Sequence, residues 1–175
     1  FRAYDDGMAY RFVSHLKGEY QIESETAGFN FAQDWNMWVP YADKHLESLE
    51  AQLFNSFEST YTYEPLSQWK KERLAFLPIM VDGPDGKKIV ITESDLMNYP
   101  GMHIHNSDAD SKLEGYFAAL PDQRKQGGHN MLQMIVQSRK PYLAECEGET
   151  SFPWRIVAVS EKDVQMADND MVYRL

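Results

Sequence analysis

The stretch KKIVITESDLMNYPGMHIH, from Lys87 to His105, joins an apolar strand to an acidic strand end and a tight turn. Successive side chains of a strand point to opposite faces, so Ile89, Ile91 and Glu93 share one face. That face is apolar except for its last residue, which is a carboxylate. A buried acid needs a partner, and an arginine, backbone amides or a cation could each provide one.

The loop that follows this strand is predicted to be short and ordered. Ser94 and Asp95 are typical helix caps, which predicts a helical turn through residues 96–97. Pro100 and Gly101 then bend the chain before it extends again. A rigid strand that carries an acid into such a loop is typical of the rim of a binding or catalytic site.

The composition limits the classes of partner. The 175 residues carry 27 acidic and 17 basic side chains, which argues against a nucleic-acid partner because such proteins present basic surfaces. No run approaches the roughly 20 apolar residues of a membrane-spanning helix, so we expect no membrane span. Cys146 is the only cysteine, so no internal disulfide can form. Because residue 1 is Phe, we expect a segment of a longer protein.

Apolar segments with the period of a strand recur along the chain, and turn residues separate them. Residues 74–81 are apolar on both faces, which predicts a central strand that forms a hairpin with 89–93. We expect further strands at 8–14, 20–24, 28–32, 35–39, 57–63, 102–105, 113–118, 141–145 and 154–160. Many strands without regular helices between them predict an all-β fold, an antiparallel β-sandwich with one or two short helices.

Three segments follow other patterns. Residues 43–54 have leucines at helical spacing, which fits either an amphipathic helix or a long loop that covers the sheet. Residues 121–134 are polar and contain two adjacent glycines, which predicts a loop folded across the mouth of the sheet. Ser160 and Asp163 form a candidate capping box for a helix at 161–167, and an extended segment should end the chain.

The histidines and acids offer few metal ligands. His103 and His105 would share a strand face, and His129 could be a third ligand, but surface or loop-packing roles are favoured because no cysteine pair completes a zinc site. Glu93 and Asp95 provide hard oxygen atoms, which suit calcium better than zinc. Capping a helix is the more common role for an acid at the position of Asp95.

Four motifs resemble one known family: DDGMAYRF at residues 5–12, ITESDLMNYPGM at 91–102, FPWRIVAVSEKD at 152–163 and DNDMVYRL at 168–175. They occur in the same order as in the amino-terminal domain of glycoside hydrolase family 97. The resemblance implies that residues 1–175 form most of an antiparallel β-sandwich of the galactose-mutarotase type. It also implies that the first strands of the sandwich precede Phe1, which would leave a sheet edge unpaired.

What the resemblance implies about activity concerns a larger protein. Family members are bacterial, exo-acting α-glucosidases or α-galactosidases, periplasmic or secreted, that act on α-linked oligosaccharides. The catalytic (β/α)8 barrel would be a partner domain of the same polypeptide, outside this chain. The catalytic acid and base would lie in that barrel, so no catalytic residue is assigned here.

The resemblance further implies an active-site calcium ion held mainly by glutamates of the barrel, with one glutamate from the sandwich. By motif position Glu93 is the candidate ligand. Tyr99, Met102 and His103 are candidates for shaping the pocket entrance and contacting substrate. A shared calcium ion would also balance the charge of a buried Glu93, whereas a Glu93 exposed to water or paired with an arginine of its own sheet would contradict that argument.

Two other interpretations stay open at this point. The chain could be a non-catalytic carbohydrate-binding sandwich, in which Trp35, Trp38 or Trp154 stacks on sugar and calcium is structural. It could also be a scaffold that stiffens a partner domain, in which case Glu93→Ala would change stability without changing calcium-dependent turnover.

Overall fold

The computed structural model describes residues 1–42, 48–55, 57–106 and 111–175. Its strands are β1 (Arg2–Tyr4), β2 (Gly7–Tyr10), β3 (Val13–Ser14), β4 (Glu19–Ile22), β5 (Gly28–Asn30), β6 (Asn36–Val39), β7 (Thr62–Pro65), β8 (Ile79–Asp82), β9 (Lys88–Ser94), β10 (Met102–His105), β11 (Lys112–Phe117), β12 (Pro121–Gly127), β13 (Gln133–Arg139), β14 (Ala144–Glu147), β15 (Thr150–Ser151) and β16 (Trp154–Ser160). Two short α-helices are α1 (Leu49–Gln52) and α2 (Asp163–Ala167), and short 3-10 turns include η3 (His129–Met131) and η4 (Met171–Tyr173).

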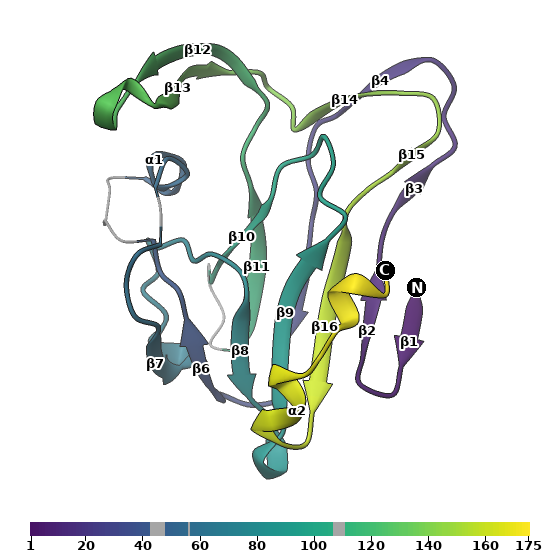
Figure 1. The fold of residues 1–175 in the computed structure, drawn as a ribbon, viewed down its shortest axis with the longest axis vertical. Helices are drawn as coiled ribbons and strands as arrows, with labels where there is room; N and C mark the ends of the chain where they lie inside the picture. Colours follow the sequence, from purple (N-terminus) through teal and green to yellow (C-terminus); the bar gives the residue numbers. More distant parts are fainter. Residues whose placement is uncertain (43–47, 56, 107–110) are drawn as a thin grey trace.

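Two antiparallel sheets form the body of the fold (Figure 1). One has seven strands in the order β1-β2-β16-β9-β8-β6-β7, and the other has three in the order β10-β11-β5. The remaining strands pair two by two, as β12-β13, β14-β4 and β15-β3. The predicted all-β antiparallel sandwich with short helices is therefore confirmed. No helix in the described ranges is long and apolar enough to cross a bilayer.

The inner faces of the two sheets enclose the main core. Met37 and Val39 of β6 alternate with exposed neighbours, so the strand period places both side chains on the buried face. Ile91 of β9 and Ile104 of β10 meet them from the two sheets, each at most 1% exposed. Because residues of both sheets share one apolar cluster, burial of that cluster holds the sheets together.

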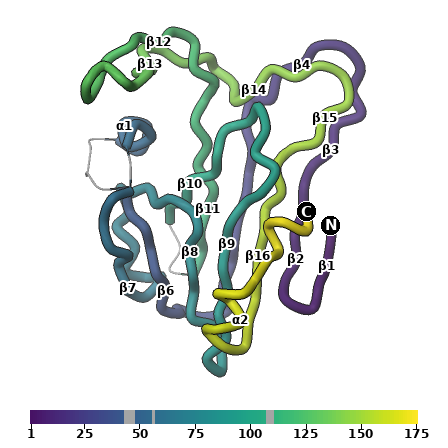
Figure 2. Tube along the Cα trace, viewed as in Figure 1, coloured from purple at the N-terminus to yellow at the C-terminus, as the bar shows by residue number. Residues whose placement is uncertain are grey.

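The outer face of the larger sheet is covered near its middle by the end of the chain. Trp154 and Ile156 of β16 point to this side and pack against Met171 of η4, which is fully buried. Figure 2 shows the carboxyl-terminal segment crossing β16 and β9, with the two chain ends lying near each other. The strand β16 is thus buried on both faces, as its unbroken apolar pattern predicts.

Several predicted elements are confirmed with shifted bounds. The strand predicted at 57–63 is wrong over residues 57–61, because pairing with β6 begins at Thr62 and runs to Pro65. The strand predicted at 74–81 begins only after Pro78, which has no amide hydrogen for a ladder, and it forms the predicted hairpin with β9. The strand predicted at 141–145 is found at 144–147. The helical alternative holds for residues 49–52 of the segment 43–54, of which 43–47 lie outside the described residues.

Other predictions of local structure are wrong. Residues 121–134 do not fold across the sheet but belong to the antiparallel hairpin β12-β13. The helix α2 starts after Lys162, and no side chain caps it, so the predicted capping box is absent. The last residues form the turn η4 and not an extended segment. This turn buries the apolar side chain of Met171 against the larger sheet.

A steric constraint at Gly7 generates a stability prediction. Gly7 has φ of +150°, and a Cβ there would lie 2.4 Å from the carbonyl oxygen of Val157 and 2.9 Å from the Cα of Ala158. Because backbone atoms cannot move aside, Gly7→Ala should lower the free energy of unfolding by about 2–4 kcal/mol. Gly18 has φ of +78° with open space around it, so Gly18→Ala should lose only about 1–2 kcal/mol. Urea unfolding followed by tryptophan fluorescence measures both, and equal losses would contradict the steric argument.

Candidate functional site at the end of strand β9

Glu93 lies directly opposite Arg155 in the antiparallel pair of β9 and β16. Arg155 Nη1 donates a hydrogen bond of 2.6 Å to Glu93 Oε2. The backbone N–H of Met102 donates to both carboxylate oxygens of Glu93, at 3.1 Å each. The acid that ends the apolar face therefore bridges the two sheets, because Arg155 belongs to the larger sheet and Met102 begins β10 of the smaller one.

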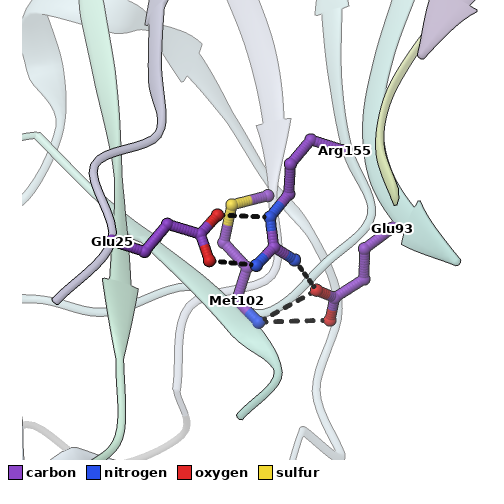
Figure 3. A network of polar contacts seen from close by, with 4 residues as sticks. All are labelled: Glu25, Glu93, Met102 and Arg155. Carbon is purple, nitrogen blue, oxygen red and sulfur yellow. Dashed lines mark hydrogen bonds and ion pairs between the residues drawn. The ribbon is translucent and has the colours of Figure 1, made fainter. Parts of the chain in front are cut away.

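A second acid completes the network. Glu25 accepts from Arg155 Nε at 2.8 Å and from Arg155 Nη2 at 2.7 Å, which is the bidentate geometry of a strong guanidinium–carboxylate pair. Figure 3 shows the guanidinium of Arg155 between the two carboxylates. Its side chain is 1% exposed and stacks 4.9 Å from the ring centre of Phe117. Glu25 comes from the segment between β4 and β5, so three parts of the chain meet at one buried cation.

The network holds two acids and one base, and this imbalance governs its electrostatics. Burial raises the pKa of Glu93, and the negative charge of Glu25 raises it further, against the lowering effects of the Met102 N–H and of Arg155. Burial alone would lower the pKa of Arg155, but the two carboxylates raise it. The guanidinium therefore stays charged, and one cation is shared by two acids in a poorly hydrated place.

The physical argument that Glu93 requires a divalent ion is wrong. An arginine of its own sheet already pairs with Glu93, which is the condition that contradicts the argument. Calcium takes six to eight oxygen ligands, and among the described residues no group of three or more His, Cys, Asp or Glu side chains is placed to hold a metal ion. The described residues therefore do not form a calcium site by themselves, and Glu93 could at most add one ligand to a site built elsewhere.

The loop after β9 is held in a strained conformation and not in the predicted helical turn. Asp95 and Asn98 have φ of 58° and 52°, values that residues other than glycine seldom adopt. Asp95 caps no helix, because its carboxylate pairs with Arg11 at 3.0 Å. The Ser94 hydroxyl donates to the carbonyl of Val172 at 2.8 Å. Strain held by surrounding contacts is typical of functional loops.

The structure separates the three residues predicted to contact substrate. Tyr99 and His103 line a hollow of about 290 Å³ between this loop and the base of the hairpin β12-β13. Met102 is 3% exposed and its side chain packs in the main core, so within this chain it offers a substrate little surface. Its backbone N–H contributes instead, by fixing Glu93.

The two residues that line the hollow differ in their packing. The Tyr99 ring packs edge-on against Phe152 with centres 5.3 Å apart, and burial, with Glu25 nearby, raises the pKa of its hydroxyl. The His103 ring packs against Phe76 with centres 5.2 Å apart, and burial lowers the pKa of the imidazole. Within the described residues His103 Nδ1 is buried without a hydrogen-bond partner. Packing therefore accounts for most of the surface of both rings.

The three tryptophans considered for sugar stacking lie in different surroundings. Trp154 is 4% exposed and has the guanidinium groups of Arg2 and Arg11 over its ring, at 4.8 and 4.9 Å. Trp35 is partly buried against the main core. Trp38 is 38% exposed and lies against exposed Tyr63, with ring centres 4.6 Å apart. Of the three, Trp38 is therefore the one that could stack on a ligand.

Glu25 and Arg155 are the functional residues that the sequence reasoning missed. Arg155 interrupts the apolar run WRIVAV of β16 and is buried. A base in a strand that is buried on both faces signals a paired acid, just as the acid at the end of β9 signals a base. Glu25 carries no such signal, because it lies in a polar segment between two short strands.

The comparisons with known proteins agree with this architecture. The sequence model described as "Glycosyl-hydrolase 97 N-terminal" matches residues 1–175. The chain belongs to this family. It is 43% identical over 176 residues to a protein named "Retaining alpha-galactosidase" from Bacteroides thetaiotaomicron, and the match covers 100% of this chain and 27% of that protein.

Solved structures of glycoside hydrolase family 97 enzymes share the fold. An enzyme from Pseudoalteromonas sp. strain K8, in complex with acarbose, superposes with a TM-score of 0.66 over 96% of this chain at 17% identity. A variant of a family 97 enzyme from the same strain, in complex with panose, gives the same values. The match covers 22% of each solved chain, so this chain spans about a quarter of the length of its relatives.

The buried network generates a second prediction. Arg155→Met would leave Glu25 and Glu93 buried without a counter-charge and should lower the free energy of unfolding by about 3–5 kcal/mol. Arg174→Met is the matched control, because Arg174 pairs with Asp6 and Asp170 near the solvent, where ion pairs contribute much less than buried ones. Adding Glu25→Gln and Glu93→Gln to Arg155→Met should recover most of the loss. Urea unfolding curves test this, and equal effects of the two arginine variants would contradict it.

Proposed function

We propose that this chain is the amino-terminal β-sandwich of a calcium-dependent, exo-acting α-glycoside hydrolase, and that the enzyme cleaves α-galactosides. The observation that carries the proposal is the 43% identity over the whole chain to a retaining α-galactosidase. The structures with acarbose and panose share only 17% identity and therefore support the fold and not the substrate. A periplasmic or secreted location stays a prediction from the resemblance.

The chemistry of the described residues supports an accessory role. General acid–base catalysis of glycoside hydrolysis needs two carboxyl groups that flank the scissile bond. Glu25 and Glu93 are both bound to Arg155 and largely buried, so neither is free to protonate a leaving group or to attack a sugar. The catalytic carboxylates would belong to the (β/α)8 barrel of the same polypeptide, and this chain would shape the pocket entrance with Tyr99, His103 and the strained loop before them.

An assay of the longer protein that contains this chain tests the proposal. It should hydrolyse p-nitrophenyl α-galactoside faster than p-nitrophenyl α-glucoside, because this chain is 43% identical to the corresponding part of a retaining α-galactosidase. Release of p-nitrophenol measures both rates. A protein that hydrolyses neither glycoside contradicts the enzymatic function, and one that prefers the glucoside contradicts only the choice of sugar.

The calcium ion at Glu93 remains a proposal that rests on the family resemblance. Its other ligands would have to come from outside this chain, and Glu93 would provide one oxygen beside the guanidinium of Arg155. Calcium would orient the reacting groups and offset developing negative charge when bound. What the chain itself contributes is the fixed position of Glu93, set by Arg155 and by the Met102 N–H.

Calcium titration tests the ligand assignment. In the longer protein, after removal of metal with EDTA, Glu93→Gln should weaken calcium binding by at least about tenfold, because a neutral amide replaces a charged ligand. Asp95→Asn is the control, since Asp95 is held by Arg11 in the neighbouring loop. Isothermal titration calorimetry measures the affinities, and an unchanged affinity for Glu93→Gln would contradict the assignment.

The exposed pair of Trp38 and Tyr63 favours a second candidate, a carbohydrate-binding sandwich. Tyr63 donates to Asp82 at 2.6 Å, and Lys88 pairs with Asp82 at 2.9 Å, so polar groups flank the aromatic surface. Aromatic faces with adjacent polar groups suit a sugar ring. The two functions are distinguished in the longer protein: loss of sugar binding in Trp38→Ala with unchanged hydrolysis of p-nitrophenyl glycosides would favour a binding module.

A further inference from the structure

The hairpin β12-β13 stands apart from both main sheets. Within the described part of the chain its strands pair only with each other, over Pro121–Gly127 and Gln133–Arg139. Figures 1 and 2 show it extending from the upper end of the sandwich, above α1. A two-stranded hairpin by itself is at best marginally stable in water, so its conformation depends on contacts elsewhere.

The base of the hairpin is anchored, and the anchor fixes its direction. Arg139 pairs with Glu50 of α1, and its Nη1 donates to the carbonyl of Ala119 at 2.7 Å. Asp122 at the other strand pairs with Lys140 at 2.7 Å. Arg139 therefore ties the base of the hairpin to α1 and to the segment before β12, Asp122 and Lys140 tie its two strands to each other, and the far half has no comparable ion pairs among the described residues.

The tip is fixed by its own hydrogen bonds. Gln126 Nε2 donates to the carbonyl of Met131 at 2.8 Å, and Gln133 Oε1 accepts from the backbone N–H of His129 at 3.3 Å. Asn130 and Met131 have φ of 50° and 58°, which residues other than glycine seldom adopt. The tip is therefore held in one defined, strained shape, which lowers the entropy lost when it binds a partner.

The side chains that the tip presents are apolar, and the hairpin that carries them has a net positive charge. Met131, Leu132 and Met134 are 56%, 82% and 56% exposed. Between residues 121 and 139 the charged side chains are Arg124, Lys125 and Arg139 against Asp122, a net charge of +2 in a chain whose net charge is −10. Exposed apolar side chains gathered at one place mark an interaction site, and the positive charge favours an acidic partner.

We infer that the hairpin β12-β13 is a docking arm whose tip is buried against the part of the same polypeptide that lies beyond these 175 residues. Relatives of the chain are about four times as long, since the matches cover 27% and 22% of them, so most of the surface available to the tip is in that part. The partner surface would have an apolar hollow for Leu132 with acidic side chains around it.

Docking through the hairpin would also place the hollow of Tyr99 and His103 beside the partner domain. The base of the hairpin, at residues 118–121, lines that hollow together with the loop 98–101. An arm that binds on one side of the hollow fixes the distance between the loop and the partner. The inference rests on the proposed function only in needing a second domain, whatever that domain catalyses.

Photo-crosslinking tests the arm. The longer protein is prepared with the photoreactive residue p-benzoylphenylalanine in place of Leu132, and separately in place of Leu16, a 58% exposed leucine between β3 and β4. Equal amounts of isotopically heavy and light protein are mixed before irradiation, so that mass spectrometry separates links within one polypeptide from links between copies. Hydrolysis of p-nitrophenyl α-galactoside is measured on both variants.

The arm predicts links from position 132 to residues after 175 of the same polypeptide, in several-fold excess over links from position 16. Links only between copies, links only within residues 1–175, or a yield equal to that at position 16 would each overturn it. Links of the predicted kind in a protein without glycosidase activity would support the arm and contradict the proposed function. Glycosidase activity without links of this kind would support the proposed function and contradict the arm.

Discussion

The fold depends on one buried cation shared by two acids. The guanidinium of Arg155 binds Glu93 of the neighbouring strand and Glu25 of a segment that joins two other strands, while Glu93 also holds the first amide of β10. A charge with 1% exposure is tolerated only if its hydrogen bonds are satisfied. Satisfying them requires the two sheets to meet in one register, so the network selects this arrangement of the sandwich more than it adds net stability.

The same network accounts for the shape of the loop that joins β9 to β10. The loop after β9 starts just beyond Glu93 and Ser94 and returns at Met102, whose amide donates to Glu93 across the loop. Arg11 holds Asp95 at the start of the loop, and the ring of Tyr99 is packed on Phe152 near its end. A loop held at these points can keep two residues in left-handed conformations, so the surface of the loop is already formed in this chain.

The sequence predicted the class of the fold well and the local details less well. The strands β6, β9 and β16 were found close to their predicted bounds, whereas the apolar run 74–81 forms a strand only from Ile79. The predicted turn at 96–97 and the predicted extended end of the chain were wrong, because Arg11 holds Asp95 and Met171 packs in a buried cluster. Such contacts join residues that are far apart in the sequence, and no local pattern contains them.

The amino-acid sequence by itself determined the all-β class, the alternation that makes the core, the family, and the presence of an unusual acid at the end of β9. Only the tertiary structure decided which group balances that acid. A strand pattern gives the face on which a side chain lies, but the strand beside it depends on how the whole sheet is ordered. Arg155 is 62 residues from Glu93 in the sequence and directly opposite it in the sheet, and for that reason their pairing could be seen only in three dimensions.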